Sequence, residues 1–323
     1  MHGASPLAMD PDGVVVHFFG KVVSLGRANN VAQLIGTRCA VLACLLSAWS
    51  VLDHLRRNAS PQVRCHIIRI LLLVPVYAVD AALGLERSPL EVPRTLLRET
   101  YEAYVLLSFM RLVVACDKAA AAAGVPGCHR DPADVKSMRR MQFGVWQYVV
   151  LCGMASPVVA FVAWLLGAYH VGSFEVTDAY LYCTTLQFVS QSYALLSVGR
   201  LLHHTRKELA PIRPVIKFMS IKALIFFTWI QSVAITVLEG MSSLGQISLW
   251  IEFDRDDVVS HWWDPLGVFN YVESVRGRHD AWKNHEVRNY VGSGLGSLVL
   301  CLEMLVFAFV HFRAWPCSEW DPQ

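Results

Sequence analysis

Seven long apolar blocks, separated by polar connections, dominate the pattern of hydrophobic and polar positions along the chain. An α-helix needs roughly 20 residues to cross a hydrocarbon core of about 30 Å. Each block is close to that length, and the blocks cover residues 32–52, 67–85, 96–116, 143–169, 179–202, 215–238 and 291–312. The pattern therefore predicts an all-α, polytopic membrane protein: a bundle of seven transmembrane helices.

The composition supports a membrane protein over a soluble one. Hydrophobic residues make up 54% of the 323-residue chain and charged residues only 17%. Buried helices in a large soluble core are the alternative, but they would need amphipathic partner helices, which the sequence lacks. The third block is the most polar, because Arg98, Glu99, Glu102 and Arg111 interrupt it, so we expect it inside the bundle.

The distribution of basic residues predicts the orientation of the helices. Lysine and arginine gather in the first, third and fifth connections, and the positive-inside rule assigns these connections to the cytoplasm. The N-terminus then lies outside and the C-terminus inside. We divide the chain into an extracytoplasmic segment (1–31), six helices (32–240), a long extracytoplasmic loop (241–290), and the last helix with a short cytoplasmic tail (291–323).

Two extracytoplasmic stretches leave alternatives open. The apolar patch Val14–Phe19 is either an interfacial segment or part of a poorly ordered N-terminus. The loop 241–290 contains Trp250, Trp262 and Trp263, which suit interfacial anchors on the membrane surface. A folded cap over a pore mouth is the other interpretation of this loop.

Four charged residues lie deep in the predicted spans and are the first candidates for function. On insertion scales a charge at the centre of a span costs about 2.5 to 3.5 kcal/mol, so these side chains should face one another or water. Asp80 and Glu102 fall in the outer half of the membrane, and Lys222 and Glu303 fall in the inner half. Depth alone therefore suggests two pairs.

Each pair has more than one interpretation. Lys222 and Glu303 would form an ion pair that either fixes helix register or takes part in substrate binding or gating. Asp80 and Glu102 cannot both stay ionised at close range without a cation, so they would share a proton, bind a cation, or have an arginine such as Arg98 between them. Alternatively, each acid is hydrogen-bonded separately to a tyrosine at position 77, 101 or 104.

Further polar residues complete the candidate lining. Glu99 and Glu102 share one helix face, as do Gln187 and Gln191, and Gln231 lies in the sixth block. These side chains either line a cavity or join neighbouring helices by hydrogen bonds.

Proline and cysteine add local expectations. Pro75 predicts a kink in the second span. Cys116, Cys128 and Cys317 lie near predicted cytoplasmic ends of spans, where they are candidates for reversible palmitoylation.

Missing motifs argue against several classes of protein. The last block has no lysine for retinal, and neither the Asp-Arg-Tyr nor the Asn-Pro-x-x-Tyr motif of many receptors occurs. No phosphate-binding loop and no metal-ligand spacing is present, so we expect no enzyme, no metal site, no cofactor and no nucleic-acid partner.

Five stretches resemble the solute-transporter-α superfamily. They are HIIRILLLVPVYAVDAALGL (66–85), YEAYVLLSFM (101–110), FGVWQYVVL (143–151), PIRPVIKFMSIKALIFFTWIQ (211–231) and LVLCLEMLVFAF (298–309). Within the superfamily the chain is more similar to the transmembrane protein 184 group than to organic solute transporter subunit alpha. It departs from the family pattern at Gly294–Leu298, where relatives usually carry Gln-Asn-Phe or Gln-Asp-Phe, and in the longer loop before Tyr290.

The resemblance implies a seven-helix membrane protein that moves amphipathic organic solutes, sterol-derived or other organic anions, down their gradients. It also implies the lipid bilayer as the environment and a single-span β-like subunit or a homodimer as the assembly. The membrane would be the plasma membrane or an endosomal or vacuolar membrane. The competing hypothesis is a non-transporting scaffold or receptor-like protein in endomembrane trafficking.

Overall fold

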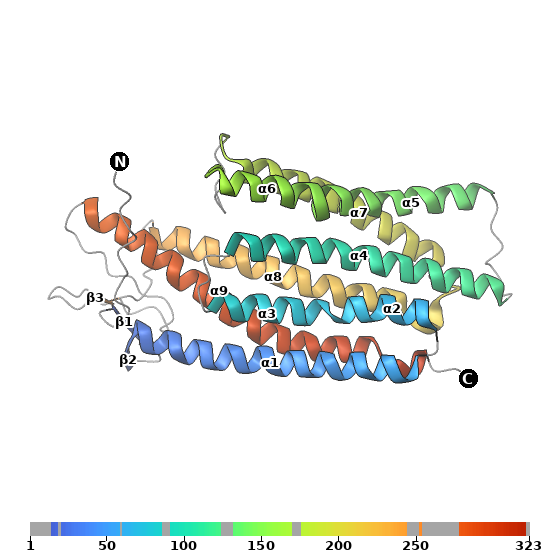
Figure 1. The fold of residues 1–323 in the computed structure, drawn as a ribbon, viewed down its shortest axis with the longest axis horizontal. Helices are drawn as coiled ribbons and strands as arrows, with labels where there is room; N and C mark the ends of the chain where they lie inside the picture. Colours follow the sequence, from blue (N-terminus) through green and yellow to red (C-terminus); the bar gives the residue numbers. More distant parts are fainter. Residues whose placement is uncertain are drawn as a thin grey trace. The chain divides into compact units, whose positions relative to one another are not determined.

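The computed structural model describes residues 14–18, 21–58, 60–85, 91–123, 132–169, 176–243, 252–253 and 278–320. The helices in these ranges are α1 (Leu25–Arg57), α2 (Pro61–Leu71), α3 (Leu73–Leu85), α4 (Glu91–Ala122), α5 (Pro132–Val150), α6 (Ser156–Leu165), α7 (Ala179–Thr205), α8 (Pro214–Ser243) and α9 (Arg278–Ala314) (Figure 1). A π-helix (Leu151–Ala155) joins α5 to α6, and Ala210–Ile212 and Cys317–Glu319 form 3₁₀ turns. Only Leu72 separates α2 from α3, so the described helices form seven stretches that overlap the seven predicted blocks.

Five helical stretches of the described chain are long and apolar enough to cross a membrane. They are Val31–Arg57, Pro61–Leu85, Val135–Leu165, Ala210–Ile235 and Gly294–Glu319. α4 and α7 are not among them, because charged residues interrupt α4 and hydroxyl and amide side chains interrupt α7. Large apolar side chains such as Trp49 and Phe188 point outward, as expected of helices that face lipid. The helical fold is confirmed, and five of the seven predicted blocks correspond to helices with the length and composition of a membrane span. The crossings themselves, including those by α4 and α7, stay predictions.

The chain divides into two compact units. The first unit comprises Met1–Cys39, Ala81–Glu86 and Phe226–Leu302, and the second comprises Ala40–Asp80, Arg87–Ile225 and Glu303–Gln323. The divisions fall within α1, α3, α8 and α9.

A small antiparallel sheet in the first unit departs from the all-α prediction. Its strand order is β2 (Lys21–Ser24), β1 (Val14–Phe18), β3 (Glu252–Phe253), and Val14 pairs with Phe253. Three consecutive valines open β1, and β-branched residues favour extended backbone. The apolar patch at Val14–Phe19 is therefore mainly a strand. One of its two partner strands, β3, comes from the stretch predicted as a separate loop.

The helices that flank the predicted loop 241–290 are longer than the apolar blocks. α8 ends at Ser243 and α9 begins at Arg278. The first part of α9 is polar, so the apolar block predicted from hydropathy does not include it. A helix can nevertheless continue beyond the hydrocarbon core of a membrane. Trp250, Trp262 and Trp263 lie outside the described residues.

The second span is interrupted close to its proline. Pro75 has no backbone N–H, so it cannot bond the carbonyl of Leu71 as a helical residue would. The backbone turns at Leu72, whose N–H still bonds Ile68 O at 3.0 Å, and Val76 N resumes the ladder to Leu72 O at 3.1 Å. The interruption lies where the sequence predicts the kink.

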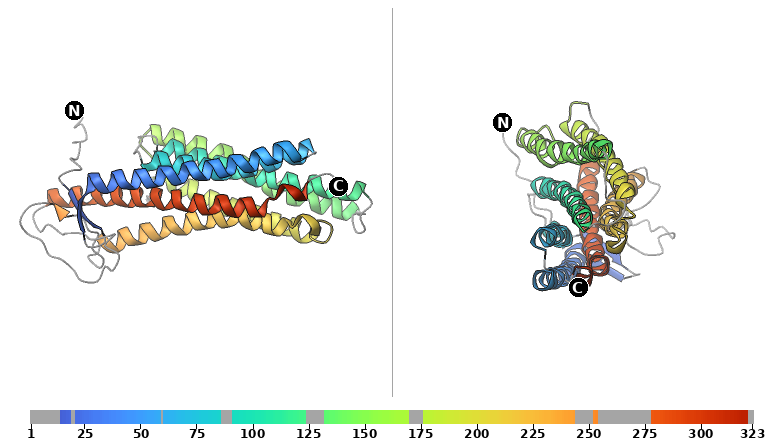
Figure 2. Two further views of the ribbon diagram at one scale, coloured as in Figure 1. Left: turned by 90° about the horizontal axis from the view of Figure 1, so that it is seen from below. Right: turned by 90° about the vertical axis from the view of Figure 1, so that its right-hand side faces the viewer.

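α5 and α7 are packed closely in the second unit and lie side by side in Figures 1 and 2. An added Cβ at Gly144 of α5 would lie 2.0 Å from Ser197 Oγ and 2.7 Å from Ser197 Cβ on α7. One turn further along, Gln147 Nε2 donates to Ser190 O at 3.0 Å, and Ser190 Oγ donates back to Gln147 Oε1 at 2.8 Å. A small residue and a reciprocal amide contact therefore fix this helix pair.

We expect Gly144→Ala to lower the free energy of unfolding by about 1 to 3 kcal/mol, because the methyl group would force α5 away from α7. Gly199→Ala on α7 is the matched control: nothing lies within 4 Å of a Cβ at Gly199, so alanine should stabilise the helix by about 0.5 to 1 kcal/mol. Unfolding of the purified protein in detergent measures both. Equal effects of the two substitutions would contradict the close packing at Gly144.

Candidate functional site

Asp80, near the middle of α3, binds two arginines of α4. Arg94 Nη1 lies 3.1 Å from Asp80 Oδ1, and Arg98 Nη1 lies 2.8 Å from Asp80 Oδ2. Arg94 also donates to the backbone carbonyl of Asp80. The two arginines are four residues apart on one helix, so they share a face, and the Asp80 side chain between them is only 12% exposed.

Glu102 accepts hydrogen bonds on both carboxylate oxygens. Tyr77 Oη donates to Oε2 at 3.1 Å, and Gln191 Nε2 donates to Oε1 at 3.1 Å. Glu102 thus joins α4 to α3 and α7. The interpretation in which a tyrosine satisfies the acid separately agrees with this contact.

Arg98 connects the Asp80 and Glu102 contacts. Its guanidinium carbon lies 5.4 Å from the centroid of the Tyr77 ring, whose hydroxyl binds Glu102. Arg98 therefore lies beside Asp80 and Tyr77 together, as the hypothesis of an arginine between the two acids requires.

Glu99 extends the same set of contacts toward α7. Gln187 Nε2 donates to Glu99 Oε2 at 2.7 Å, one turn from the Gln191–Glu102 contact. The acids of α4 share a face, and the amides of α7 meet that face, as their spacing predicts. We call the residues that make these contacts the α3–α4–α7 polar network: Tyr77, Asp80, Arg94, Arg98, Glu99, Glu102, Gln187 and Gln191.

The predicted ion pair between Lys222 and Glu303 is wrong. No ion pair within the described chain joins these two residues, and Glu303 Oε2 is buried without a hydrogen-bond partner there. Glu102 acts electrostatically on Lys222, but no hydrogen bond or ion pair joins these two residues in the described chain. Equal depth placed Lys222 and Glu303 together in the prediction, but the rotation of each helix about its axis decides which side chains meet.

Gln231 belongs to the first unit and makes a contact of its own there. Its Nε2 donates to Gly296 O at 2.6 Å, which joins α8 to α9. An added Cβ at Gly296 would meet Ile235 Cδ1 at 3.1 Å, so glycine permits this close approach. The contact matches the interpretation of Gln231 as a hydrogen-bonding link between helices.

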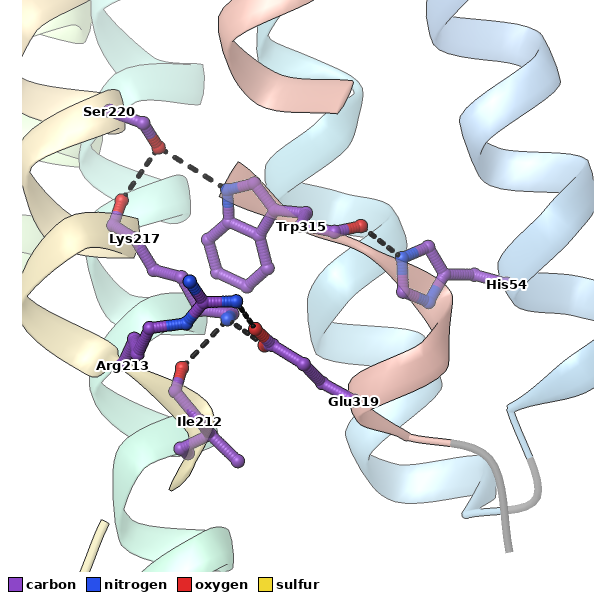
Figure 3. A network of polar contacts seen from close by, with 7 residues as sticks. All are labelled: His54, Ile212, Arg213, Lys217, Ser220, Trp315 and Glu319. Carbon is purple, nitrogen blue, oxygen red and sulfur yellow. Dashed lines mark hydrogen bonds and ion pairs between the residues drawn. The ribbon is translucent and has the colours of Figure 1, made fainter. Parts of the chain in front are cut away.

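A second polar cluster, which sequence reasoning missed, surrounds Lys217 in the second unit (Figure 3). Lys217 Nζ forms an ion pair with Glu319 of the C-terminal 3₁₀ turn and donates to Ile212 O at 2.7 Å. Arg213 Nη2 binds the other carboxylate oxygen of Glu319 at 2.7 Å. Only 2% of the Lys217 side chain and 12% of the Glu319 side chain are exposed.

Trp315 holds the same cluster to α8 and α1. Its indole Nε1 donates to Ser220 Oγ at 3.3 Å, and its backbone carbonyl lies 3.0 Å from His54 Nε2 (Figure 3). Lys217 Nζ lies 5.5 Å from the centroid of the Trp315 ring. The sequence signal was a lysine within the apolar run 215–221 and two acids, Glu319 and Asp321, in a short aromatic tail.

Two of the three predicted palmitoylation sites are buried in the structure. Cys116 and Cys317 are buried, and Cys317 Sγ donates to Asp53 O at 3.5 Å, so the folded chain does not present these thiols for acylation. Cys128 lies outside the described residues. Within the described ranges, no group of three or more His, Cys, Asp or Glu side chains could hold a metal ion.

The relatives found by comparison with known proteins include two from Arabidopsis thaliana. The chain is 29% identical over 234 residues to Protein LAZ1 homolog 2, across 64% of this chain and 58% of that protein. It is 28% identical over 244 residues to Protein LAZ1, across 64% of this chain and 48% of that protein. The chain thus spans about half the length of the curated relatives it matches, and no solved structure matches it.

The family comparison agrees with the motif resemblance. The LAZ1 proteins belong to the transmembrane protein 184 group, the predicted branch. The family model for the organic solute transporter Ostalpha matches residues 32–320, nearly the whole chain. The chain therefore belongs to the organic solute transporter Ostalpha family.

Proposed function

We propose that the protein is a facilitative membrane transporter of amphipathic organic anions, sterol-derived or similar, and not an enzyme. The observation that carries the proposal is the position of Lys222 in α8. Its ammonium lies within a candidate span, interacts with Glu102, and forms no ion pair among the described residues. A cation that forms no ion pair in an apolar segment is costly, and a passing anion would supply the missing ion-pair partner.

The polar network supports the proposal by its balance of charge. The network contains three acids, Asp80, Glu99 and Glu102, and two cations, Arg94 and Arg98, and Lys222, which lies outside the network, would be the third cation. Asp80 already has two arginine partners, whereas amides and a tyrosine alone bind Glu99 and Glu102 directly. An anion that approached Lys222 would therefore compete with Glu102 and leave the Asp80 ion pairs intact.

An amphipathic solute also needs an apolar surface beside the charge. Candidate spans and aromatic residues border the network, including Tyr101, whose hydroxyl donates to Arg69 O at 2.7 Å, and Tyr104, whose ring lies under Arg69. Aromatic rings with a polar edge suit the ring system of a steroid conjugate.

The ends of the helices in the second unit support the proposed orientation. The C-terminal end of α1 and the first half of α5 carry basic residues, and they lie at the same end of the second unit as the C-terminus (Figure 1). The positive-inside rule would place this end in the cytoplasm and the N-terminus outside. We propose the plasma membrane or an endosomal or vacuolar membrane as its site, with a single-span subunit or a second copy as partner.

Flux of a radiolabelled steroid sulfate into proteoliposomes tests the proposal. We expect Lys222→Gln to reduce the initial rate roughly tenfold, since the counter-charge for the anion is lost. Lys207→Gln, an exposed lysine after α7, is the control for loss of one positive charge and should leave the rate unchanged. An unconjugated steroid, which has no charge, should distinguish transport from passive leakage.

The same flux measurement distinguishes the proposed transporter from the competing function. Absence of flux for every amphiphile tested, with and without a single-span partner, would overturn the proposal and favour a non-transporting scaffold or receptor-like protein in trafficking. The closed ion pairs of Asp80 are the observation on which that second function rests, because fixed pairs suit a static bundle.

A further inference from the structure

A basic pocket of about 620 Å³ opens between the start of α5 and the end of α7, within the second unit. Lys136, Arg139 and Arg140 line it from α5, and Arg200 lines it from α7. None of the described residues that line the pocket is acidic. Four cations from two helices therefore converge on one cavity.

These cations are available to a ligand. All four side chains are exposed, and none takes part in an ion pair within the described chain. Like charges on neighbouring positions repel one another, so the pocket carries an electrostatic cost that an anion would relieve. A ligand with several negative charges would gain more than a monoanion.

The walls of the pocket are fixed before any ligand binds. Ser197 is buried and lines the pocket, and it packs directly against Gly144, where the two helices approach most closely. The Gln147–Ser190 contacts hold the next turn. Because α5 and α7 are locked together, the backbone of Arg200 stays opposite the basic residues of α5, and a ligand would have to order only the side chains and not the helices.

The apolar side of the pocket shows where it lies relative to a bilayer. Phe143 and Tyr193 line it and are 66% and 44% exposed. Exposed Trp146 and Leu196 continue this apolar surface along α5 and α7, and the candidate span Val135–Leu165 contains the α5 residues. The pocket thus lies where basic side chains give way to lipid-facing ones, which is the place of a phospholipid headgroup.

We propose that this pocket binds the headgroup of a polyanionic phospholipid, with Arg139, Arg140, Lys136 and Arg200 around its phosphates and Phe143 and Tyr193 against its glycerol and upper acyl chains. Bidentate arginine contacts suit phosphate oxygens, and basic pockets between transmembrane helices are common sites for such headgroups. The site is separate from the α3–α4–α7 polar network, and the proposal holds whether or not the protein transports a solute.

Titration of the full chain in neutral detergent with dioctanoyl phosphatidylinositol bisphosphate tests the site, with binding measured by thermophoresis. We expect Arg139→Gln combined with Arg200→Gln to weaken binding roughly thirtyfold. Arg206→Gln combined with Lys207→Gln removes the same charge from exposed positions after α7 that do not line the pocket, and it should bind like the wild type. Dioctanoyl phosphatidylglycerol, with one negative charge, should bind at least tenfold more weakly.

Three outcomes would overturn the proposal. The first is equal weakening by the control pair, which would indicate a diffuse basic surface. The second is equally tight binding of inositol trisphosphate, which would indicate a soluble polyphosphate as the ligand. The third is no binding of the bisphosphate lipid by the wild type. Thermal unfolding without lipid checks that each variant folds, and Lys136→Gln combined with Arg140→Gln replaces the first pair if it does not.

Discussion

Glu319→Gln should lower the free energy of unfolding by about 3 to 5 kcal/mol, because it leaves the ammonium of Lys217 buried without its carboxylate. Lys217 is 2% exposed, so water cannot replace the lost partner. The carbonyl of Ile212 and the ring of Trp315 would still contact the ammonium, which favours the lower part of that range. Unfolding of the purified protein in detergent, followed by tryptophan fluorescence, measures the change.

Two variants separate the buried ion pair from the exposed one. Arg213→Gln should cost at most about 1 kcal/mol, because the Arg213 side chain is 59% exposed and surface ion pairs contribute little. Lys217→Met combined with Glu319→Leu should recover most of the stability, since an apolar pair has no desolvation cost. Similar losses of unfolding free energy for Arg213→Gln and Glu319→Gln would contradict the prediction. The buried ion pair of Glu319 with Lys217 would then contribute no more to stability than the exposed pair with Arg213.

The lysine–glutamate contact shows which part of the structure the sequence could not provide. Lys217 and Glu319 are 102 positions apart, and hydropathy assigns one to a helix end and the other to a tail. Each is an ordinary charged residue at a membrane boundary when considered alone. Only the packing of the tail against α8 and α1 makes them a buried pair.

Local periodicity predicted the polar network more successfully. The apolar blocks locate the helices because the length of a span is set by the bilayer. The three- and four-residue spacings of Glu99 with Glu102 and of Gln187 with Gln191 predict faces, and those faces meet. Arg94 lies before the apolar block 96–116, so hydropathy alone leaves it outside that block, but α4 begins at Glu91 and includes it.

The prediction failed where it needed information that neither periodicity nor depth contains. Lys222 and Glu303 were matched by depth alone, and their helices are rotated so that no ion pair forms. The pairing of β1 with β3 was missed because both strands are short and β3 lies far along the sequence. Pairing between distant short strands depends on the folded chain.

Asp80→Asn should also destabilise the protein by about 3 to 5 kcal/mol, because it leaves two arginines in the helical bundle with no carboxylate between them. Arg94 and Arg98 each donate to a different oxygen of Asp80, so a single substitution removes both ion pairs. An asparagine has one acceptor oxygen and an amide group that donates, and the amide would face a guanidinium that can only donate. The loss of unfolding free energy in detergent measures the effect.

A double-mutant cycle tests whether Arg98 is the partner responsible. Asp80→Asn with Arg98→Gln should be more stable than the sum of the single changes predicts, by about 0.5 to 3 kcal/mol, because the second substitution removes a cation that the first left unpaired. Glu303→Gln is the matched control for loss of a carboxylate in a span: its Oε2 has no partner in the described chain, so the change should stay within about 1 kcal/mol. Two outcomes would contradict the prediction: equal losses of unfolding free energy for Asp80→Asn and Glu303→Gln, or strict additivity of Asp80→Asn with Arg98→Gln. Either would mean that the ion pairs of Asp80 do not hold α3 to α4.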